Sequence, residues 1–273
     1  MKRALSTVFI MFLSIFVFSS CSHFDPYMLD VFGLVTPVVL QMTPEEVFDH
    51  GIDDILDAEE YELKITSYTD YTVVGELSGI KLRDVPSDTT EYMVVKESGE
   101  SVHLEIDYKF HDSLGAERAE TVSLIYVDGM LYIDDHGIRE KKEVSRDDKE
   151  INESAIYQAM DTVTKLLFFA YKPDGDNFNG VELVKDGDLY KMEMDFVTRE
   201  PFQVIPQNSS GGFSLGRANG KLSAYFDGNG NLKNYELALE AEARGLHVST
   251  KYEIECDISE TEISPPANAD SYS

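Results

Sequence analysis

Three residue types that can form a hydrolytic triad follow one another in the C-terminal third of the chain. Ser214 lies in the pattern Gly212-Phe213-Ser214-Leu215-Gly216, and Asp227 and His247 come after it. This G-x-S-x-G pattern indicates a serine nucleophile when a strand precedes it and a helix follows, because the sharp turn between them exposes the hydroxyl. Here a Ser/Gly-rich stretch precedes Ser214, and residues 217–220 lead into a predicted strand. A flexible hairpin loop is the favoured interpretation, and a serine hydrolase is the unfavoured alternative.

Acidic and histidine residues occur in three patterns that could bind a cation. The turn Asp227-Gly228-Asn229-Gly230-Asn231 is acidic, but it lacks the glycine and the acid that a calcium loop needs at its sixth and twelfth positions. His103 and His111 are eight residues apart on one strand, too far to share a metal. Asp134-Asp135-His136 could bind a cation weakly, although such a cluster is more often simply solvated. We therefore expect no metal and no cofactor.

Charge excludes one class of partner. The chain has 51 acidic and 23 basic residues and a formal net charge of −28. A protein with this charge repels phosphate backbones and anionic lipid surfaces. Nucleic-acid binding is therefore excluded, and the acidic residues, which are spread along the whole chain, indicate a solvated surface.

The first 21 residues have the composition of a secretory signal. Lys2 and Arg3 precede a short apolar run that ends at Phe18, and two serines lead to Cys21. A basic start, a short apolar core and small residues are typical of a signal peptide, and the core is too short for a membrane-spanning helix. The serine pair before Cys21 resembles a bacterial lipobox, although Phe18 stands where leucine is usual.

The lipobox resemblance implies that Cys21 is the lipid attachment site, acylated with palmitate-type chains. Each buried acyl CH₂ contributes about 0.8 kcal/mol, so a multiply acylated cysteine holds a protein on a membrane. Loss of residues 1–20 would remove two positive charges from −28 and leave −30. We expect a cell-envelope protein tethered to a membrane through Cys21. The alternatives are an ordinary signal peptide with an incidental cysteine and an uncleaved anchor.

Cysteine count limits how the fold is held together. Cys21 and Cys256 are the only cysteines. If Cys21 carries lipid, Cys256 has no partner within the chain, and a disulfide framework is excluded. Because Cys256 falls on the apolar side of the last predicted strand, we expect a buried free thiol.

Two helices are predicted among many strands. Thr43, Pro44 and Glu46 form a capping-box start for a helix that ends near Glu59, and a second helix is predicted from about Asp148 to Tyr171. Between and after them the apolar period changes to two, with D-G turns at Asp128 and Asp186. This pattern predicts one α+β domain, a large curved antiparallel sheet with two helices packed on one face.

The order of these elements resembles the LolA/LolB-like half-barrel superfamily, which includes lipoprotein carriers and receptors and LppX-type lipid-binding lipoproteins. Ile52–Thr66 and Tyr126–Tyr132 carry the likeness most clearly, within a region from about Thr43 to Ile258. The resemblance implies a half-barrel that buries acyl chains or other apolar ligands between sheet and helices. No functional residue is carried over except Cys21.

The predicted organisation has four parts. Residues 1–20 are the signal peptide, residues 21–42 a tether with an apolar N-terminal segment, residues 43–260 the single domain, and residues 261–273 a disordered tail.

The apolar sides of two predicted strands are the remaining indication of a binding site. Methionine and tyrosine at such positions more often belong to a packed core, but they can also line an adaptable pocket. If both strands face the helices, they line one ligand cavity; the candidate residues are Leu104, Ile106, Tyr108, Tyr190, Met192 and Met194.

These observations lead to two interpretations. The favoured one is a membrane-anchored lipoprotein that binds a lipid or other apolar ligand as carrier or sensor, without enzymatic activity. The alternative is a structural or interaction lipoprotein of the envelope with a filled core and no ligand. Protein partners are not predicted.

Overall fold

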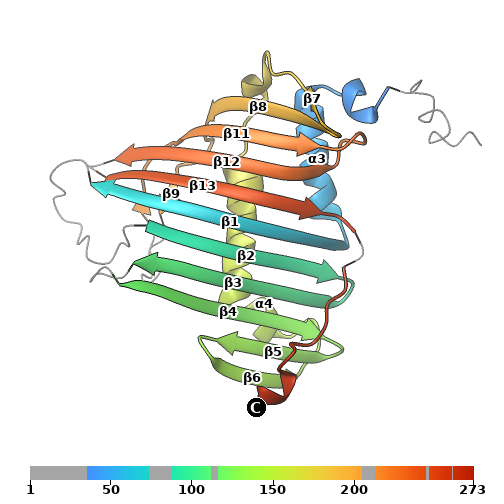
Figure 1. Ribbon diagram of the computed structural model, residues 1–273, viewed down its shortest axis with the longest axis vertical. Helices are drawn as coiled ribbons and strands as arrows, with labels where there is room; N and C mark the ends of the chain where they lie inside the picture. The colour runs from blue at the N-terminus through green and yellow to red at the C-terminus, as the bar shows by residue number, and fades with distance from the viewer. Residues whose placement is uncertain (1–35, 74–87, 112–115, 205–212, 244–245, 260) are drawn as a thin grey trace, which may run out of the picture.

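A single wide antiparallel sheet dominates the molecule (Figure 1). The computed structural model describes residues 36–73, 88–111, 116–204, 213–243, 246–259 and 261–273. Eleven strands follow the order β6-β5-β4-β3-β2-β1-β13-β12-β11-β8-β7, and β9 pairs separately with β10. The two edge strands are not bonded to each other, so the sheet is open. A large open antiparallel sheet with few helices is consistent with the predicted half-barrel.

Every strand pair in the described residues is antiparallel. The bounds of the strands are β1 Glu60–Val73, β2 Asp88–Ser98, β3 Ser101–His111, β4 Glu117–Val127, β5 Met130–Asp135, β6 Ile138–Glu143, β7 Val184–Asp186, β8 Leu189–Val197, β9 Gln203–Val204, β10 Phe213–Ser214, β11 Asn219–Phe226, β12 Leu232–Ala243 and β13 Leu246–Asp257.

The first part of the described chain packs beside the turn between β11 and β12. A 3₁₀ turn, η1 (Val38–Gln41), places Val39 fully inside the core while Val38 and Leu40 remain about half exposed. The Val39 amide donates to the Gly228 carbonyl at 3.2 Å. Only this end of the predicted apolar N-terminal segment lies within the described residues.

Helix α3 (Pro44–Asp57) begins where the capping box predicts. The Thr43 hydroxyl accepts from the Glu46 amide, and the Glu46 carboxylate accepts from the Thr43 amide at 2.8 Å. Two orphan amides of the first turn are thereby satisfied. The helix packs on β12 and buries its apolar side against the sheet; its buried residues are Val47, Phe48, Gly51, Ile52 and Ile55.

The prediction of one helix from Asp148 to Tyr171 is wrong. The segment forms α4 (Lys149–Asn152), α5 (Ala155–Lys165) and a π-helical turn, η3 (Leu166–Ala170). The break occurs because Ser154 is a second N-cap: its hydroxyl accepts from the Tyr157 amide at 3.2 Å. A serine inside a helical pattern competes for backbone hydrogen bonds and favours a new helix start.

One face of the sheet carries the core, and the strand phases predicted from period two are confirmed. Leu104 and Ile106 are buried on β3, and Met192 and Met194 on β8. The register links them, because residues directly opposite each other in antiparallel strands point to the same face. One such row crosses the sheet without a break: Met192, Ala224, Tyr235, Ile254, Ile65, Met93, Ile106 and Val122.

The prediction that residues 261–273 are disordered is also wrong. Ile263, Ala269 and Tyr272 pack on a small apolar cluster on the other face of the sheet, formed by Ile125, Val127 and Tyr132. The Tyr272 ring meets the Tyr132 ring edge-on, with centroids 5.5 Å apart.

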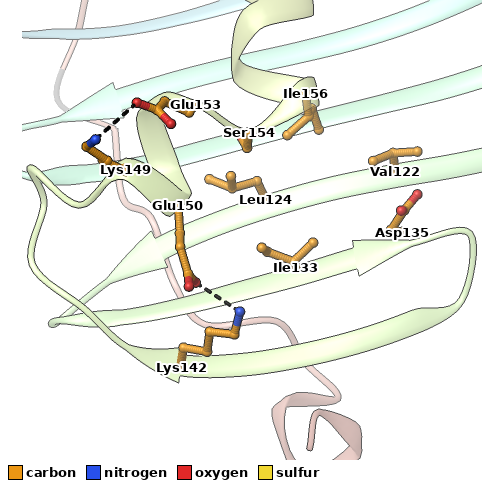
Figure 2. A pocket seen from close by; sticks show the side chains of 10 residues that line it. All are labelled: Val122, Leu124, Ile133, Asp135, Lys142, Lys149, Glu150, Glu153, Ser154 and Ile156. Carbon is orange, nitrogen blue, oxygen red and sulfur yellow. Dashed lines mark ion pairs between the residues drawn. The ribbon is translucent and has the colours of Figure 1, made fainter.

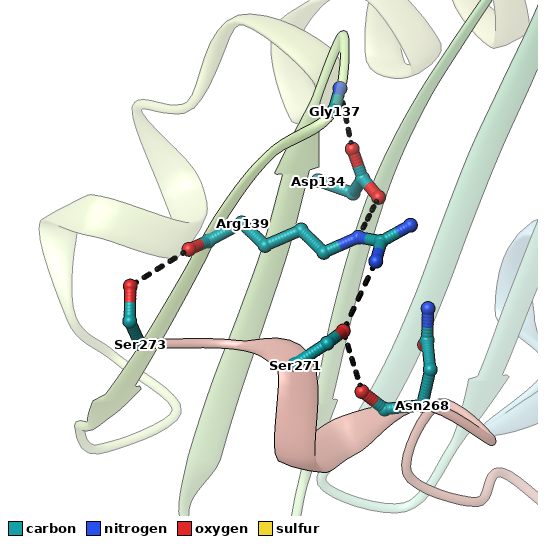
Figure 3. A network of polar contacts seen from close by, with 6 residues as sticks. All are labelled: Asp134, Gly137, Arg139, Asn268, Ser271 and Ser273. Atoms are coloured by element: carbon teal, nitrogen blue, oxygen red, sulfur yellow. Dashed lines mark hydrogen bonds and ion pairs between the residues drawn. The ribbon is translucent and has the colours of Figure 1, made fainter.

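Polar contacts fix this C-terminal segment to strand β6 (Figure 3). Arg139 Nη1 donates to the Ser271 hydroxyl at 3.0 Å, while Arg139 Nε donates to Asp134 at 2.8 Å. The Lys141 amide donates to the Ser273 carbonyl at 3.3 Å. The polar composition of the segment predicts disorder, because it does not reveal these contacts. The segment packs here because the outer face of β4 and β5 carries apolar side chains that it shields from water.

Candidate functional site

A cleft of about 530 Å³ lies between α4, the start of α5 and strands β4 to β6 (Figure 2). Pockets of about 300–1,000 Å³ are typical of small-molecule sites. The cleft therefore has the size of a ligand site. Its lining residues are Val122, Leu124, Ile133, Asp135, Lys142, Lys149, Glu150, Glu153, Ser154 and Ile156.

The floor of the cleft is apolar. Leu124 is fully buried and Ile156 is 6% exposed, while Val122 and Ile133 are partly buried against the core. Val122 and Leu124 are two residues apart on β4 and therefore share a face, and Ile133 of β5 lies directly opposite Leu124. Adjacent strands and the first turn of α5 thus supply one continuous apolar surface.

The broken helix positions the upper wall. The Asp148 carboxylate caps α4 by accepting from the Glu150 amide at 2.9 Å, and Ser154 caps α5. A single straight helix would have carried residues 149–154 in the direction of α5. The second cap instead sets α4 as a separate turn, which presents Lys149, Glu150 and Glu153 at the mouth of the cleft.

Ion pairs cross the rim of the cleft. Lys142 Nζ of β6 lies 2.9 Å from Glu150 and 3.2 Å from Glu140, and Lys149 lies 3.9 Å from Glu153. The hydrogen bond to Glu150, followed by that to Glu140, raises the pKa of Lys142. The side chains of the Lys142 pairs are about half exposed and those of the Lys149–Glu153 pair are mostly exposed, so solvent screens all of these ion pairs and each stabilises the rim only weakly.

The candidates on β3 lie one strand away from the cleft. Leu104 and Ile106 face Leu124 and Val122 across the β3–β4 ladder, but neither is among the lining residues. Tyr108 is only partly buried, and this burial, with the nearby carboxylates of Glu91 and Glu120, raises its pKa to about 12. These residues support the floor rather than form it.

The candidates on β8 lie far from the cleft. Tyr190, Met192 and Met194 are 6%, 0% and 7% exposed. Strands β3 and β8 are six places apart in the sheet order, which is roughly 29 Å along the sheet at about 4.8 Å per strand. The two predicted sets share a face, but they do not come together, and neither lines the cleft.

Aromatic side chains fill the space over β8, β11 and β12. Phe168 of η3 stacks on Tyr235 of β12 at 6.2 Å between ring centroids, and Phe48 of α3 lies 5.9 Å from the same ring. Gly51 allows α3 to approach closely, because a Cβ there would lie 3.0 Å from Leu232. We call this region, formed by β8, β11, β12, α3 and η3, the filled half. We call the region formed by β3, β4, β5, α4 and α5 the cleft half.

The Ser214, Asp227 and His247 candidates do not have triad geometry. Ser214 lies in the two-residue strand β10, followed by an irregular stretch and then β11 instead of a helix. Asp227 lies in the turn before β12, and its carboxylate accepts from the Asn229 and Asn231 amides. His247 lies on β13 opposite Glu242, near the far end of β12. Glu242 is ten residues beyond Leu232, the start of β12, which places it roughly 33 Å from the Asp227 turn at about 3.3 Å per residue.

Metal-binding geometry is not found in the part of the chain that the structure describes, where no three His, Cys, Asp or Glu residues form a suitable group. In the predicted cluster, Asp134 faces Arg139, while Asp135 lies 3.4 Å from His136. The side chain of His111 lies outside the described residues.

The two cysteines have different outcomes. Cys256 is confirmed as a buried free thiol, and its burial raises the pKa of the thiol to about 12. Cys21 and the rest of the predicted signal peptide lie outside the described residues. Among the described helices, none is long and apolar enough to cross a membrane.

Sequence reasoning missed the cleft residues on β6 and α4. Strand β6 reads Ile-Arg-Glu-Lys-Lys-Glu, with no apolar alternation, so its pairing with β5 had no signal. The Ser154 cap was present in the sequence and could have located the helix break.

Comparison with solved structures finds proteins of similar fold. No family model matches the chain, and no curated protein matches it. The chain is similar to the crystal structure of LprF from Mycobacterium bovis at 12% sequence identity and a TM-score of 0.40; the match covers 82% of this chain and 97% of that one.

Proposed function

We propose that this protein is a membrane-anchored lipoprotein that binds a lipid or other apolar ligand in the cleft under α4 and α5, as carrier or sensor. The cleft carries the proposal. It combines an apolar floor with a charged rim, the arrangement by which proteins bind an apolar body and orient a polar end. Its function is binding and not covalent chemistry.

The anchoring part of the proposal rests on Cys21. Exchange of Cys21 for alanine should abolish acylation, so the protein should stay unprocessed or appear in the aqueous fraction. The measurement is membrane fractionation with mass spectrometry of the N-terminal peptide. Normal processing and membrane retention of Cys21→Ala would contradict anchoring through this residue.

The ligand-binding part is tested by closing the cleft. Ile133→Trp places a ring over the floor, whereas Val197→Trp adds the same ring at a half-exposed position on β8. Wild type and Val197→Trp should bind the neutral apolar dye N-phenylnaphthylamine and co-purify an apolar molecule from native membranes, as detected by mass spectrometry. Ile133→Trp should lose both.

The competing function has a distinct outcome in this experiment. If wild type neither takes up the dye nor co-purifies an apolar molecule, the cleft is a surface depression. The chain is then better described as a structural or interaction lipoprotein of the envelope. The dense packing of the filled half favours that alternative.

A further inference from the structure

We infer that the ligand of the cleft carries a positively charged head group, so that amphiphilic amines or quaternary ammonium compounds bind better than neutral or anionic molecules of the same chain length. The inference rests on the proposed function, because it concerns the same cleft. Charge at the rim carries it, while the apolar floor accounts for binding of the chain.

Carboxylates outnumber cations around the cleft. Asp135, Glu150 and Glu153 line it, against two lysines, Lys142 and Lys149. Two further acids lie next to lining residues: Glu140 is 3.2 Å from Lys142, and Glu120 precedes Val122 by two residues on the same face of β4. The lysine charges are thus more than offset locally.

Both lining lysines already have carboxylate partners. Lys142 lies between Glu150 and Glu140, and Lys149 pairs with Glu153. An anionic ligand would have to displace one of these acids and leave it without its cation. The neighbouring arginines are also engaged: Arg139 pairs with Asp134 at 2.8 Å, and Arg146 donates to Asn152 at 3.2 Å.

Asp135 provides the place for a cationic head. It lies directly opposite Val122 at one end of the floor, while the Lys142–Glu150 pair lies at the other end (Figure 2). Its carboxylate lies 3.4 Å from His136, has no lysine or arginine partner among the described residues, and is 61% exposed. A chain lying along Leu124 and Ile133 would therefore bring a cationic head next to this carboxylate.

The field of the whole chain acts in the same direction. A net charge of −28 gives a negative potential over the surface, and a recess with apolar walls focuses such a field. A fatty-acid anion therefore meets repulsion both on approach and at the rim.

The test compares three probes with one chain length: dodecyltrimethylammonium, dodecanol and dodecanoate. Each is used to displace N-phenylnaphthylamine, the two ionic probes below their critical micelle concentrations and dodecanol below its solubility limit. We expect affinity to fall in that order, with the cation about tenfold tighter than the anion at low salt. The double variant Asp135→Asn/Glu120→Gln should reduce this ratio to about twofold. Asp195→Asn, which removes an exposed acid on β8, should leave it unchanged.

The outcomes separate this inference from the proposed function. Dodecanoate or dodecanol binding as tightly as the cation would overturn the charge preference but leave ligand binding intact, provided that Ile133→Trp abolishes it. An unchanged ratio in the double variant would also overturn the assignment of Asp135 and Glu120. Absence of binding by every probe would overturn both.

Discussion

The filled half and the cleft half lie on one face of one sheet, yet they are packed differently. In the filled half, α3 and η3 press large rings onto β12, with Phe168 and Tyr235 fully buried or nearly so. In the cleft half, α5 packs on β3 and β4, but Val122 and Ile133 beside it remain only partly buried and line the cleft. The register row from Met192 to Val122 crosses both, so strand pattern does not cause the difference.

The covering layer causes it. Over the filled half, an unbroken helix with a glycine at its contact point and an aromatic π-turn bring bulky side chains down to the sheet. Over the cleft half, the break at Ser154 leaves a short helix of four residues, of which Ile151 alone is apolar and buried. Packing over a continuous apolar face therefore depends on what each helix presents to it.

The largest expected effect is loss of the central ring of the filled half. Phe168→Ala should lower the free energy of unfolding by about 4 kcal/mol, because it removes a fully buried ring stacked on Tyr235. The control is the next residue, Phe169, which is 53% exposed; Phe169→Ala should cost less than about 1 kcal/mol. Urea unfolding measures both, and similar losses would contradict the assignment of the π-turn.

An added ring should distinguish the halves directly. Met192→Trp should destabilise the protein by about 3 kcal/mol, because the side chain is fully buried in a packed region. Ile133→Trp should cost less than about 1 kcal/mol, because the ring can occupy the open cleft. If one cavity extended over both halves, both variants would lose little unfolding free energy, and the contrast between the halves would then be wrong.

Burial also makes stability depend on pH at Cys256. Its thiol has a raised pKa of about 12 in the folded chain against an ordinary value of 9.0, so the folded state retains the proton more strongly. This contribution is complete below pH 9 and declines as pH rises toward 12. Relative to Cys256→Ala, wild type should lose about 1 kcal/mol of unfolding free energy between pH 8 and pH 10. Equal pH dependence in both proteins would show that the thiol is open to water.

The smallest effect concerns the outer face behind the cleft half. Tyr272→Ala should cost about 1 kcal/mol, because the ring contacts Tyr132 and lies beneath the Arg139 guanidinium at 5.8 Å. Tyr68→Ala, at a tyrosine 45% exposed, is the matched control and should cost less than about 0.5 kcal/mol. Hydrogen exchange of β6 should increase in Tyr272→Ala alone, and an unchanged exchange rate would argue against a stabilising role for the C-terminal segment.

Local patterns in the sequence determined the elements and their faces. The Thr43–Glu46 capping box specified the start of α3, and period two specified which side chains of β3 and β8 point to the core. The D-G turn at Asp128 and Gly129 joins β4 to β5 as predicted, with positive φ at both residues. Each depends on neighbours within a few residues, which is why the sequence alone could specify them.

Tertiary structure decided where the open space lies. Leu104 and Met192 have equivalent apolar positions in sequence, but strand order places them six strands apart. Whether an apolar face is filled or open depends on the volume that distant segments bring to it, such as Phe168 over one half and the charged turn of α4 over the other. The C-terminal segment is ordered for the same reason, since the apolar surface that holds Tyr272 forms only when β4 and β5 pair.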